Sequence, residues 1–97
     1  MKKGYWVVAY RAISDEAALK AYVALAGPPL QAVGARILAG PASRVQAYEA
    51  GLQQSAVIVE FESYDIALAA YESKAYQKAL QALGSGAERD FRIVEGA

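Results

Sequence analysis

The fold is most clearly indicated by residues 56–73, AVIVEFESYDIALAAYES. The first half of this stretch is dense in Val, Ile and Phe and predicts a β-strand. Ser63 then predicts a helix N-cap, because a serine oxygen can accept a hydrogen bond from a free amide of the first helical turn. A strand and helix of this kind are typical of the third strand and second helix of an RNA-recognition motif. The rest of the sequence must decide whether this strand and helix belong to an RNA-binding domain or to a domain of the same topology with another function.

Upstream, residues 4–12, GYWVVAYRA, predict a first strand rich in aromatic and β-branched side chains. Ser14 predicts the N-cap of a first helix, with Asp15 and Glu16 in the turn where the helix dipole favours negative charge. Gly27, followed by two prolines, predicts a break in that helix before a last short turn. One apolar stripe at spacings of three and four is expected on it, formed by Leu19, Tyr22, Val23, Ala26, Leu30 and Val33.

Residues 35–40, ARILAG, predict a short second strand that ends at a Gly-Pro pair. The polar residues 42–54 are expected to continue it as an irregular strand of a hairpin that turns back near Gly51. Residues 54–63 form the predicted third strand.

The second helix is expected to kink at Ser73 and to end at a Gly84 C-cap, and residues 90–96, DFRIVEG, form the fourth strand. This order predicts an α+β, ferredoxin-like βαββαβ fold, a four-stranded antiparallel sheet with both helices on one face. At 97 residues, the chain is expected to form a single domain over residues 1–97.

The RNA interpretation fails on two residues. An RNA-recognition motif carries stacking aromatics on its third strand. When Phe61 is aligned as the last aromatic, the two stacking positions fall on Ala56 and Ile58. Ten basic and ten acidic residues also cancel, so no electrostatic attraction for phosphates is expected. We expect no nucleic-acid partner.

Composition excludes further classes. Cysteine and histidine are absent, which excludes disulfides, thiol chemistry, Cys-ligated metals and the ordinary haem ligand. We therefore expect no cofactor, and any acid or base must be Asp, Glu, Tyr or Lys. The first residues fit neither a signal peptide nor a membrane span, because the apolar run is short and ends at Arg11. We expect no membrane partner and a cytoplasmic location in a bacterium-like cell.

The face of the sheet away from the helices is expected to be apolar at its centre. Alternation turns three residues of the first strand and three of the third toward the helices: Trp6, Val8, Tyr10, Val57, Val59 and Phe61. The opposite face then carries Tyr5, Val7, Ala9, Arg11, Ala56, Ile58, Glu60 and Glu62. Apolar residues with glycine included and tyrosine excluded make up about 57% of the chain, against roughly 45 to 50% in ordinary globular domains. A second copy of the chain, packed sheet to sheet as a homodimer, would cover this face.

The whole chain resembles a small bacterial family known as domain of unknown function 1330, within the dimeric α/β-barrel superfamily. The matching features are GYWVV at residues 4–8, the spacing of Asp15 and Tyr22, Gly34-Ala35-Arg36, Val59-Glu60-Phe61 with Ser63, Tyr71, the spacing of Ser73 and Tyr76, Gln77, and Val94-Glu95-Gly96. The chain departs from the family where it has Ala35, Glu16, Ala70, Lys74 and Leu83. The resemblance implies the fold and the dimer and brings no established reaction.

Four residues on the predicted open face are candidates for a ligand site. Alternation in the second strand turns Ala35, Ile37 and Ala39 toward the helices and Arg36 and Leu38 away from them. Arg36 and Glu60 would then lie within reach of each other, either as a structural ion pair or as an anion clamp with Glu60 as a possible acid or base. The same face holds Tyr5 and Arg11, which would line a pocket or pack at the interface.

The remaining polar residues have simpler interpretations. Tyr22, Tyr71 and Tyr76 are expected in the core with their hydroxyls reaching outward, and Asp15 and Ser73 are expected at helix starts. Two functions stay open. One is a homodimer that binds a small organic molecule, anionic or neutral, in a pocket between its sheets, with or without turning it over as a cofactor-independent enzyme. The other is a non-catalytic interaction or regulatory dimer with a packed interface.

Overall fold

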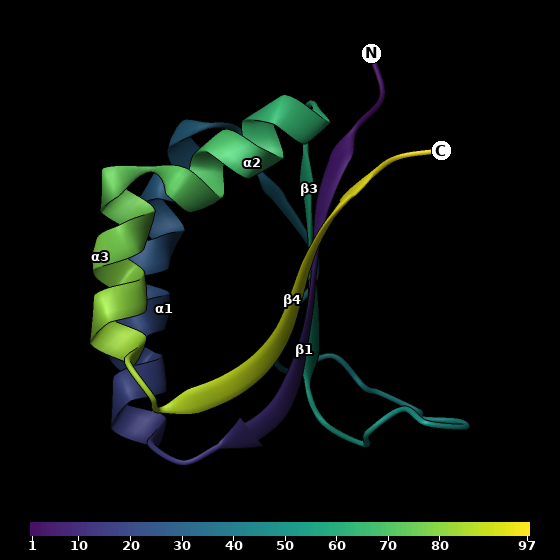
Figure 1. The fold of residues 1–97 in the computed structure, drawn as a ribbon, viewed down its shortest axis with the longest axis vertical. Coiled ribbons are helices and arrows are strands. Elements are labelled where there is room, and N and C mark those ends of the chain that lie inside the picture. Colours follow the sequence, from purple (N-terminus) through teal and green to yellow (C-terminus); the bar gives the residue numbers. More distant parts are fainter.

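The structure is a computed structural model that describes residues 1–97. Its elements are β1 (Gly4–Ile13), α1 (Glu16–Ala32), β2 (Arg36–Ala39), β3 (Ala56–Phe61), α2 (Tyr64–Glu72), α3 (Lys74–Leu83) and β4 (Ala87–Glu95). The strands form one antiparallel sheet in the order β2-β3-β1-β4. Figure 1 shows the helices covering one face of this sheet, while the other face is bare. The predicted α+β, ferredoxin-like arrangement is confirmed.

The core lies between the two layers, and the predicted strand faces are confirmed. On β1, Trp6, Val8 and Tyr10 are at most 6% exposed. On β3, Val59 and Phe61 are buried in the same cluster. Trp6 stands at its centre, with ring centroids 4.9 Å from those of Phe61 and Tyr76. None of the helices is long and apolar enough to cross a membrane.

Helix α1 differs from the prediction at both ends. Its N-cap is Asp15 and not Ser14, because the Asp15 carboxylate accepts a hydrogen bond from the amide of Ala18 at 3.1 Å. The expected break is absent, and the helix runs through both prolines to Ala32. Gly27 explains this continuity, since it has no Cβ to clash with the ring of the proline that follows it.

The second predicted helix is two helices that meet at Ser73. The Ser73 backbone is extended, and its hydroxyl oxygen accepts from the amide of Tyr76 at 3.2 Å. Ser63 caps α2 in the same way, through the amide of Ile66. Gly84 ends α3 with a positive φ. The predicted kink and both caps are therefore confirmed, and the kink is complete enough to separate α2 from α3.

Beyond Ile37, strand β2 departs from simple alternation. Ile37 lies opposite Val59, but Ala39 lies opposite Ile58, so one extra residue bulges out between them. Ala39 therefore faces the open side and not the helices, which corrects the prediction. The polar residues that follow form a loop, here called loop 40–55, and not the expected irregular strand. The reason is that its polar side chains offer no apolar face to bury.

Candidate functional site

Three of the four predicted site residues form one row across the open face. Tyr5 and Arg36 lie opposite Glu60 on its two neighbouring strands. The Tyr5 hydroxyl donates to the Glu60 carboxylate at 3.0 Å, and this hydrogen bond raises the pKa of Tyr5. An Arg36 nitrogen lies 3.6 Å from the other Glu60 oxygen. The predicted proximity of Arg36 and Glu60 is confirmed, but the Arg36 side chain is 68% exposed.

Arg11 lies apart from this row. It is six residues further along β1 than Tyr5, or roughly 20 Å at about 3.3 Å per residue. Its guanidinium donates to Asp90 at 2.9 Å, and Asp90 also pairs with Arg92 at 3.0 Å. The hydrogen bond from Arg92, followed by that from Arg11, lowers the pKa of Asp90. Arg11 therefore belongs to a separate, surface ion-pair group.

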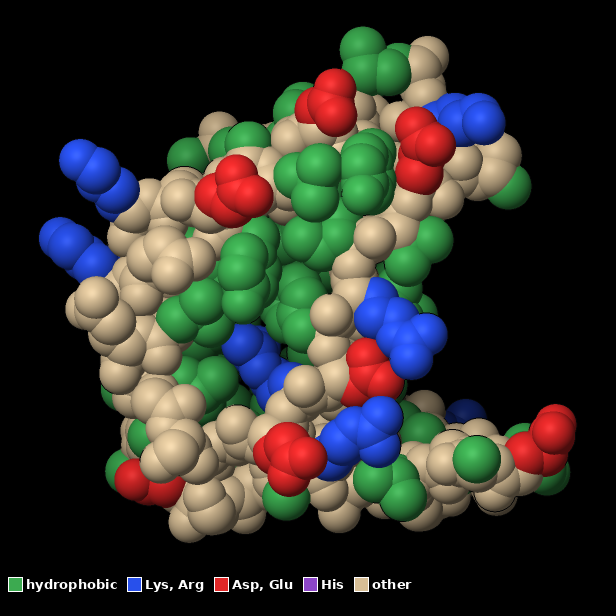
Figure 2. Space-filling model, viewed as in Figure 1, with side chains coloured by type: hydrophobic (Ala, Val, Ile, Leu, Met, Phe, Trp, Pro, Cys, Tyr) green, Lys and Arg blue, Asp and Glu red, His purple; other side chains and the backbone are tan.

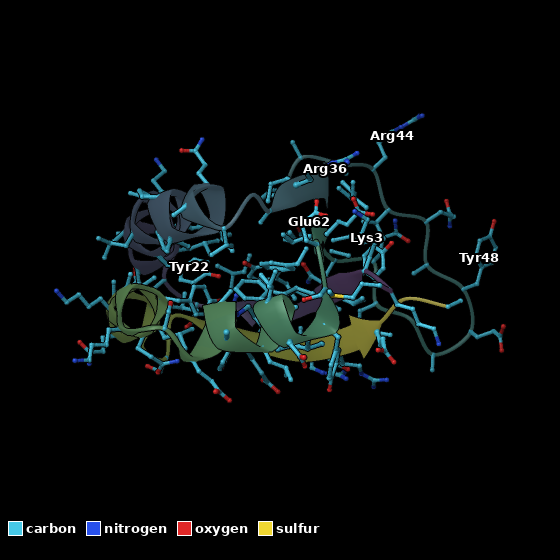
Figure 3. All side chains as sticks on the ribbon, turned by 90° about the horizontal axis from the view of Figure 1, so that it is seen from above. Lys3, Tyr22, Arg36, Arg44, Tyr48 and Glu62 are labelled. Atoms are coloured by element: carbon cyan, nitrogen blue, oxygen red, sulfur yellow. The ribbon has the colours of Figure 1, made fainter.

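Loop 40–55 adds a second wall at this end of the open face. It encloses a hollow of about 400 Å³ together with Ala9, Arg11, Ala56 and Asp90. Figure 3 shows Arg44 and Tyr48 projecting from the loop, away from the rest of the molecule. Tyr48 is 76% exposed, so the loop presents an aromatic side chain to solvent.

The more apolar candidate site lies on the other face of the sheet. A groove of about 240 Å³, here called the helix–sheet groove, runs between α1 and the four strands. Ten of its thirteen lining residues are hydrophobic, and the lining includes Trp6, Val8, Leu30, Ile37, Val57 and Val59. Figure 2 shows hydrophobic side chains gathered in the space between the helix layer and the sheet, with a basic side chain among them.

The basic residue in the helix–sheet groove is Arg89 of β4. Its guanidinium carbon lies 4.7 Å from the ring centroid of Tyr22 and 5.1 Å from that of Phe91. Its Nη1 donates to the Tyr22 hydroxyl at 3.0 Å. It forms no ion pair, unlike Arg11, Arg36 and Arg92. An apolar groove thus holds a partly buried positive charge that no carboxylate of the chain neutralises.

Two tyrosines complete this end of the groove. The hydroxyls of Tyr22 on α1 and Tyr76 on α3 lie 2.6 Å apart. Tyr22 lines the groove, whereas Tyr76 is fully buried behind it. Burial, followed by the neighbouring Tyr22, raises the pKa of Tyr76 above its usual value. The prediction that these tyrosines are core residues is confirmed, but their hydroxyls point inward and not outward.

Arg89 was not among the predicted site residues, although alternation along the fourth strand could have identified it. Phe91 and Ile93 of β4 pack against the core, and Arg89 has the same parity, so its side chain must share their face. The predicted fourth strand began at Asp90, one residue too late to include it. No three acidic side chains come close enough together to ligate a metal ion.

The fold is that of a small α+β, ferredoxin-like protein, and an apolar groove lies beneath its helix α1. The chain belongs to the family described as "Domain of unknown function (DUF1330)", whose model matches residues 3–97. The resemblance seen in the sequence is therefore confirmed, and the family brings no activity with it.

Two solved structures are similar to this one. A protein of unknown function from Rhodopseudomonas palustris, RPA0582, matches with a TM-score of 0.76 and 14% sequence identity, over 99% of this chain and 83% of that chain. Methylated RPA0582 matches with a TM-score of 0.74 and 13% identity, over 99% and 82% of the two chains. At this identity the likeness shows the fold alone. No curated protein matches the chain in sequence.

Proposed function

We propose that this protein binds a small organic molecule in the helix–sheet groove. The observation that carries the proposal is the unpaired Arg89 guanidinium inside an apolar lining. Removing a charge from water without a partner is unfavourable. Such an arrangement persists where a ligand supplies the missing interaction, and residues that serve binding commonly lower the stability of the free protein.

The size of the groove limits the ligand. Its volume of about 240 Å³ equals about eight water molecules at about 30 Å³ each. Pockets for drug-sized molecules occupy about 300 to 1,000 Å³. Because the groove is open to solvent, this volume sets the part of the ligand that the groove can enclose, which is of the size of a single substituted ring or a short acyl chain.

Binding in this groove replaces the inter-sheet site expected from the sequence. In the row of Tyr5, Glu60 and Arg36, the Glu60 carboxylate has both a hydrogen bond from Tyr5 and an ion pair with Arg36, whereas Arg89 has no carboxylate partner. The groove's ionisable side chains are Arg89, Tyr10 and Tyr22. The observations that support the proposal concern recognition of a ligand, so the proposal is one of binding.

The open face suits a second copy of the chain, and we propose a homodimer through it. Its centre is apolar, with Val7 39% exposed and Ile58 beside it at the paired position of β3. Paired charges surround this centre, including Lys3 with Glu62 at 3.1 Å. An apolar centre with a polar rim is the usual anatomy of a protein interface. Ile58→Asp should convert a dimer into monomers in light scattering, and a wild-type monomer at micromolar concentration would refute the dimer.

A groove-filling variant tests the binding proposal. Val57 lines the groove and is only half-buried, so Val57→Phe should fill part of the empty volume on a strand that tolerates aromatic residues. Small aromatic and aliphatic compounds should raise the melting temperature of the wild type and not that of the variant. Circular dichroism checks that the variant is folded, and Val33→Phe, at the exposed C-cap of α1 outside the groove lining, is the matched control. Equal stabilisation of Val57→Phe and wild type would refute a site in the groove.

A further inference from the structure

We infer that the ligand of the helix–sheet groove is a monocarboxylate with an apolar body, held through its carboxylate by Arg89 and the Tyr22 hydroxyl. This inference rests on the proposed function and specifies the chemical class that the groove accepts. Three features support it: the unpaired guanidinium, an unused hydroxyl proton beside it, and the apolar remainder of the lining.

The first feature is the charge. Arg89 remains protonated, because a guanidinium does not lose its proton in proteins. Burial by itself would lower its pKa, but the interactions with the Tyr22 and Tyr76 hydroxyls outweigh that effect and raise it. Its partners inside the protein are neutral tyrosine oxygens, with a hydrogen bond of 3.0 Å to that of Tyr22, and none is a carboxylate. The guanidinium has five N–H donors in a fork that matches a carboxylate, so donors remain for an anion in the groove.

The second feature is the direction of the Tyr22–Tyr76 hydrogen bond. Tyr76 is fully buried and does not line the groove, so its hydroxyl proton has no water to donate to. The acceptor available to it is the Tyr22 oxygen at 2.6 Å. Tyr22 then accepts from both Tyr76 and Arg89 and keeps its own proton free. Since Tyr22 lines the groove, that proton is offered to a ligand beside Arg89.

The third feature is the rest of the lining, which selects among anions. One guanidinium and one hydroxyl can satisfy the two oxygens of a carboxylate. A phosphate group carries about two charges and three strong acceptor oxygens, and the groove has no further cation for them. Beyond Arg89 the lining is apolar, with Leu30, Ile37 and Val57 available to contact a hydrocarbon body. Phenylacetate and hexanoate have the required shape and charge.

Calorimetric titration with phenylacetate and phenylacetamide tests the inference. The two compounds have nearly the same shape, and only the first is charged, so the wild-type comparison needs no variant. Charge-assisted hydrogen bonds of about 1.5 to 3 kcal/mol correspond to about ten- to hundredfold in Kd. Phenylacetate should therefore bind wild type at least about tenfold more tightly than phenylacetamide. Trp6, the single tryptophan, lines the groove and supplies a second readout by fluorescence.

Variants then assign the effect to residues. Arg89→Gln should reduce phenylacetate binding to the level of the amide, and Tyr22→Phe should weaken it by about tenfold. Arg89→Lys keeps the charge without the fork and should retain part of the affinity. Arg44→Gln, on the exposed loop, and Tyr71→Phe, outside the groove, are the matched controls and should bind as wild type does.

The carboxylate class of the ligand and binding in the groove can be refuted separately. If wild type binds both compounds equally, or if Arg89→Gln retains the preference for phenylacetate, the carboxylate class is wrong while binding in the groove stands. If neither phenylacetate, hexanoate nor their amides binds wild type at millimolar concentration, the proposed function itself fails. Equal loss in Arg89→Gln and Arg44→Gln would show that the charge acts only at long range, and would overturn the contact.

Discussion

The hydroxyls of Tyr22 and Tyr76 form one hydrogen bond, yet removing one or the other should have unequal effects. Tyr76→Phe removes the fully buried hydroxyl. The Tyr22 hydroxyl then still accepts from Arg89 at 3.0 Å and faces the groove. Tyr22→Phe leaves the Tyr76 hydroxyl buried without a partner and also removes the acceptor of Arg89.

The magnitudes follow from this asymmetry. Tyr76→Phe loses one hydrogen bond and strands no group, so the free energy of unfolding should fall by about 1 kcal/mol. Tyr22→Phe adds the desolvation of an unsatisfied buried hydroxyl, about 1 to 3 kcal/mol, so its total loss should be about 2 to 4 kcal/mol. The double variant strands no hydroxyl, and its loss should fall at least about 1 kcal/mol short of the sum of the single losses.

Urea unfolding, monitored by Trp6 fluorescence, measures the free energy of unfolding of the wild type, the two single variants and the double variant. Trp6 is a suitable probe because it is buried against Tyr76. Thermal unfolding should agree, with roughly 4 to 8 °C for each kcal/mol in a domain of this size. A Tyr76→Phe loss equal to or larger than that of Tyr22→Phe would refute the donor assignment. The free Tyr22 proton on which ligand recognition depends would then be absent.

Three further predictions concern other parts of the fold. Gly4→Ala should lower stability by about 1 to 3 kcal/mol in urea unfolding, because a Cβ there would lie 2.5 Å from the carbonyl oxygen of Ser63; an unchanged midpoint would contradict the close packing of β1 on α2. Arg36→Ala should cost less than about 1 kcal/mol, since the side chain is exposed beside Glu60; a loss of roughly 3 kcal/mol or more would show that a partner subunit buries it. Burial raises the pKa of Tyr10 above its ordinary 10.0, so its contribution to stability should be complete below pH 10 and decline as the pH rises further; a phenolate absorbance titration in which every tyrosine ionises at its ordinary pKa would contradict this.

The strand faces could be predicted from the sequence because alternation along a half-buried strand is a strong constraint. Trp6, Val8 and Tyr10 follow it without exception. The row of Tyr5, Glu60 and Arg36 could be predicted for the same reason, since their positions depend on strand order and parity. The bulge after Ile37 could not be predicted. One inserted residue reverses which side chains face the helices, and a strand of four residues is too short for its sequence pattern to reveal the insertion.

The groove could not be predicted because it depends on tertiary packing. Proline propensity predicted a break in α1 near Gly27 before a last short turn, whereas the continuous helix brings Leu30 over the sheet to line the groove. In the sequence, Arg89 looks like an exposed charged residue unless it is assigned both to the fourth strand and to the face of the sheet that packs against the helices. The partnership of Tyr22 with Tyr76 joins residues 54 positions apart, and no local pattern links them.

A crystal structure with 4-bromophenylacetate is the sharpest test of carboxylate binding in the helix–sheet groove, because anomalous scattering locates the bromine independently of how the rest of the ligand is fitted. We expect the bromine to lie in the helix–sheet groove among Leu30, Ile37 and Val57. The carboxylate should then lie within hydrogen-bond distance of Arg89 and Tyr22. Bromine on the open face beside Arg36 and Glu60, with the groove empty, would contradict it.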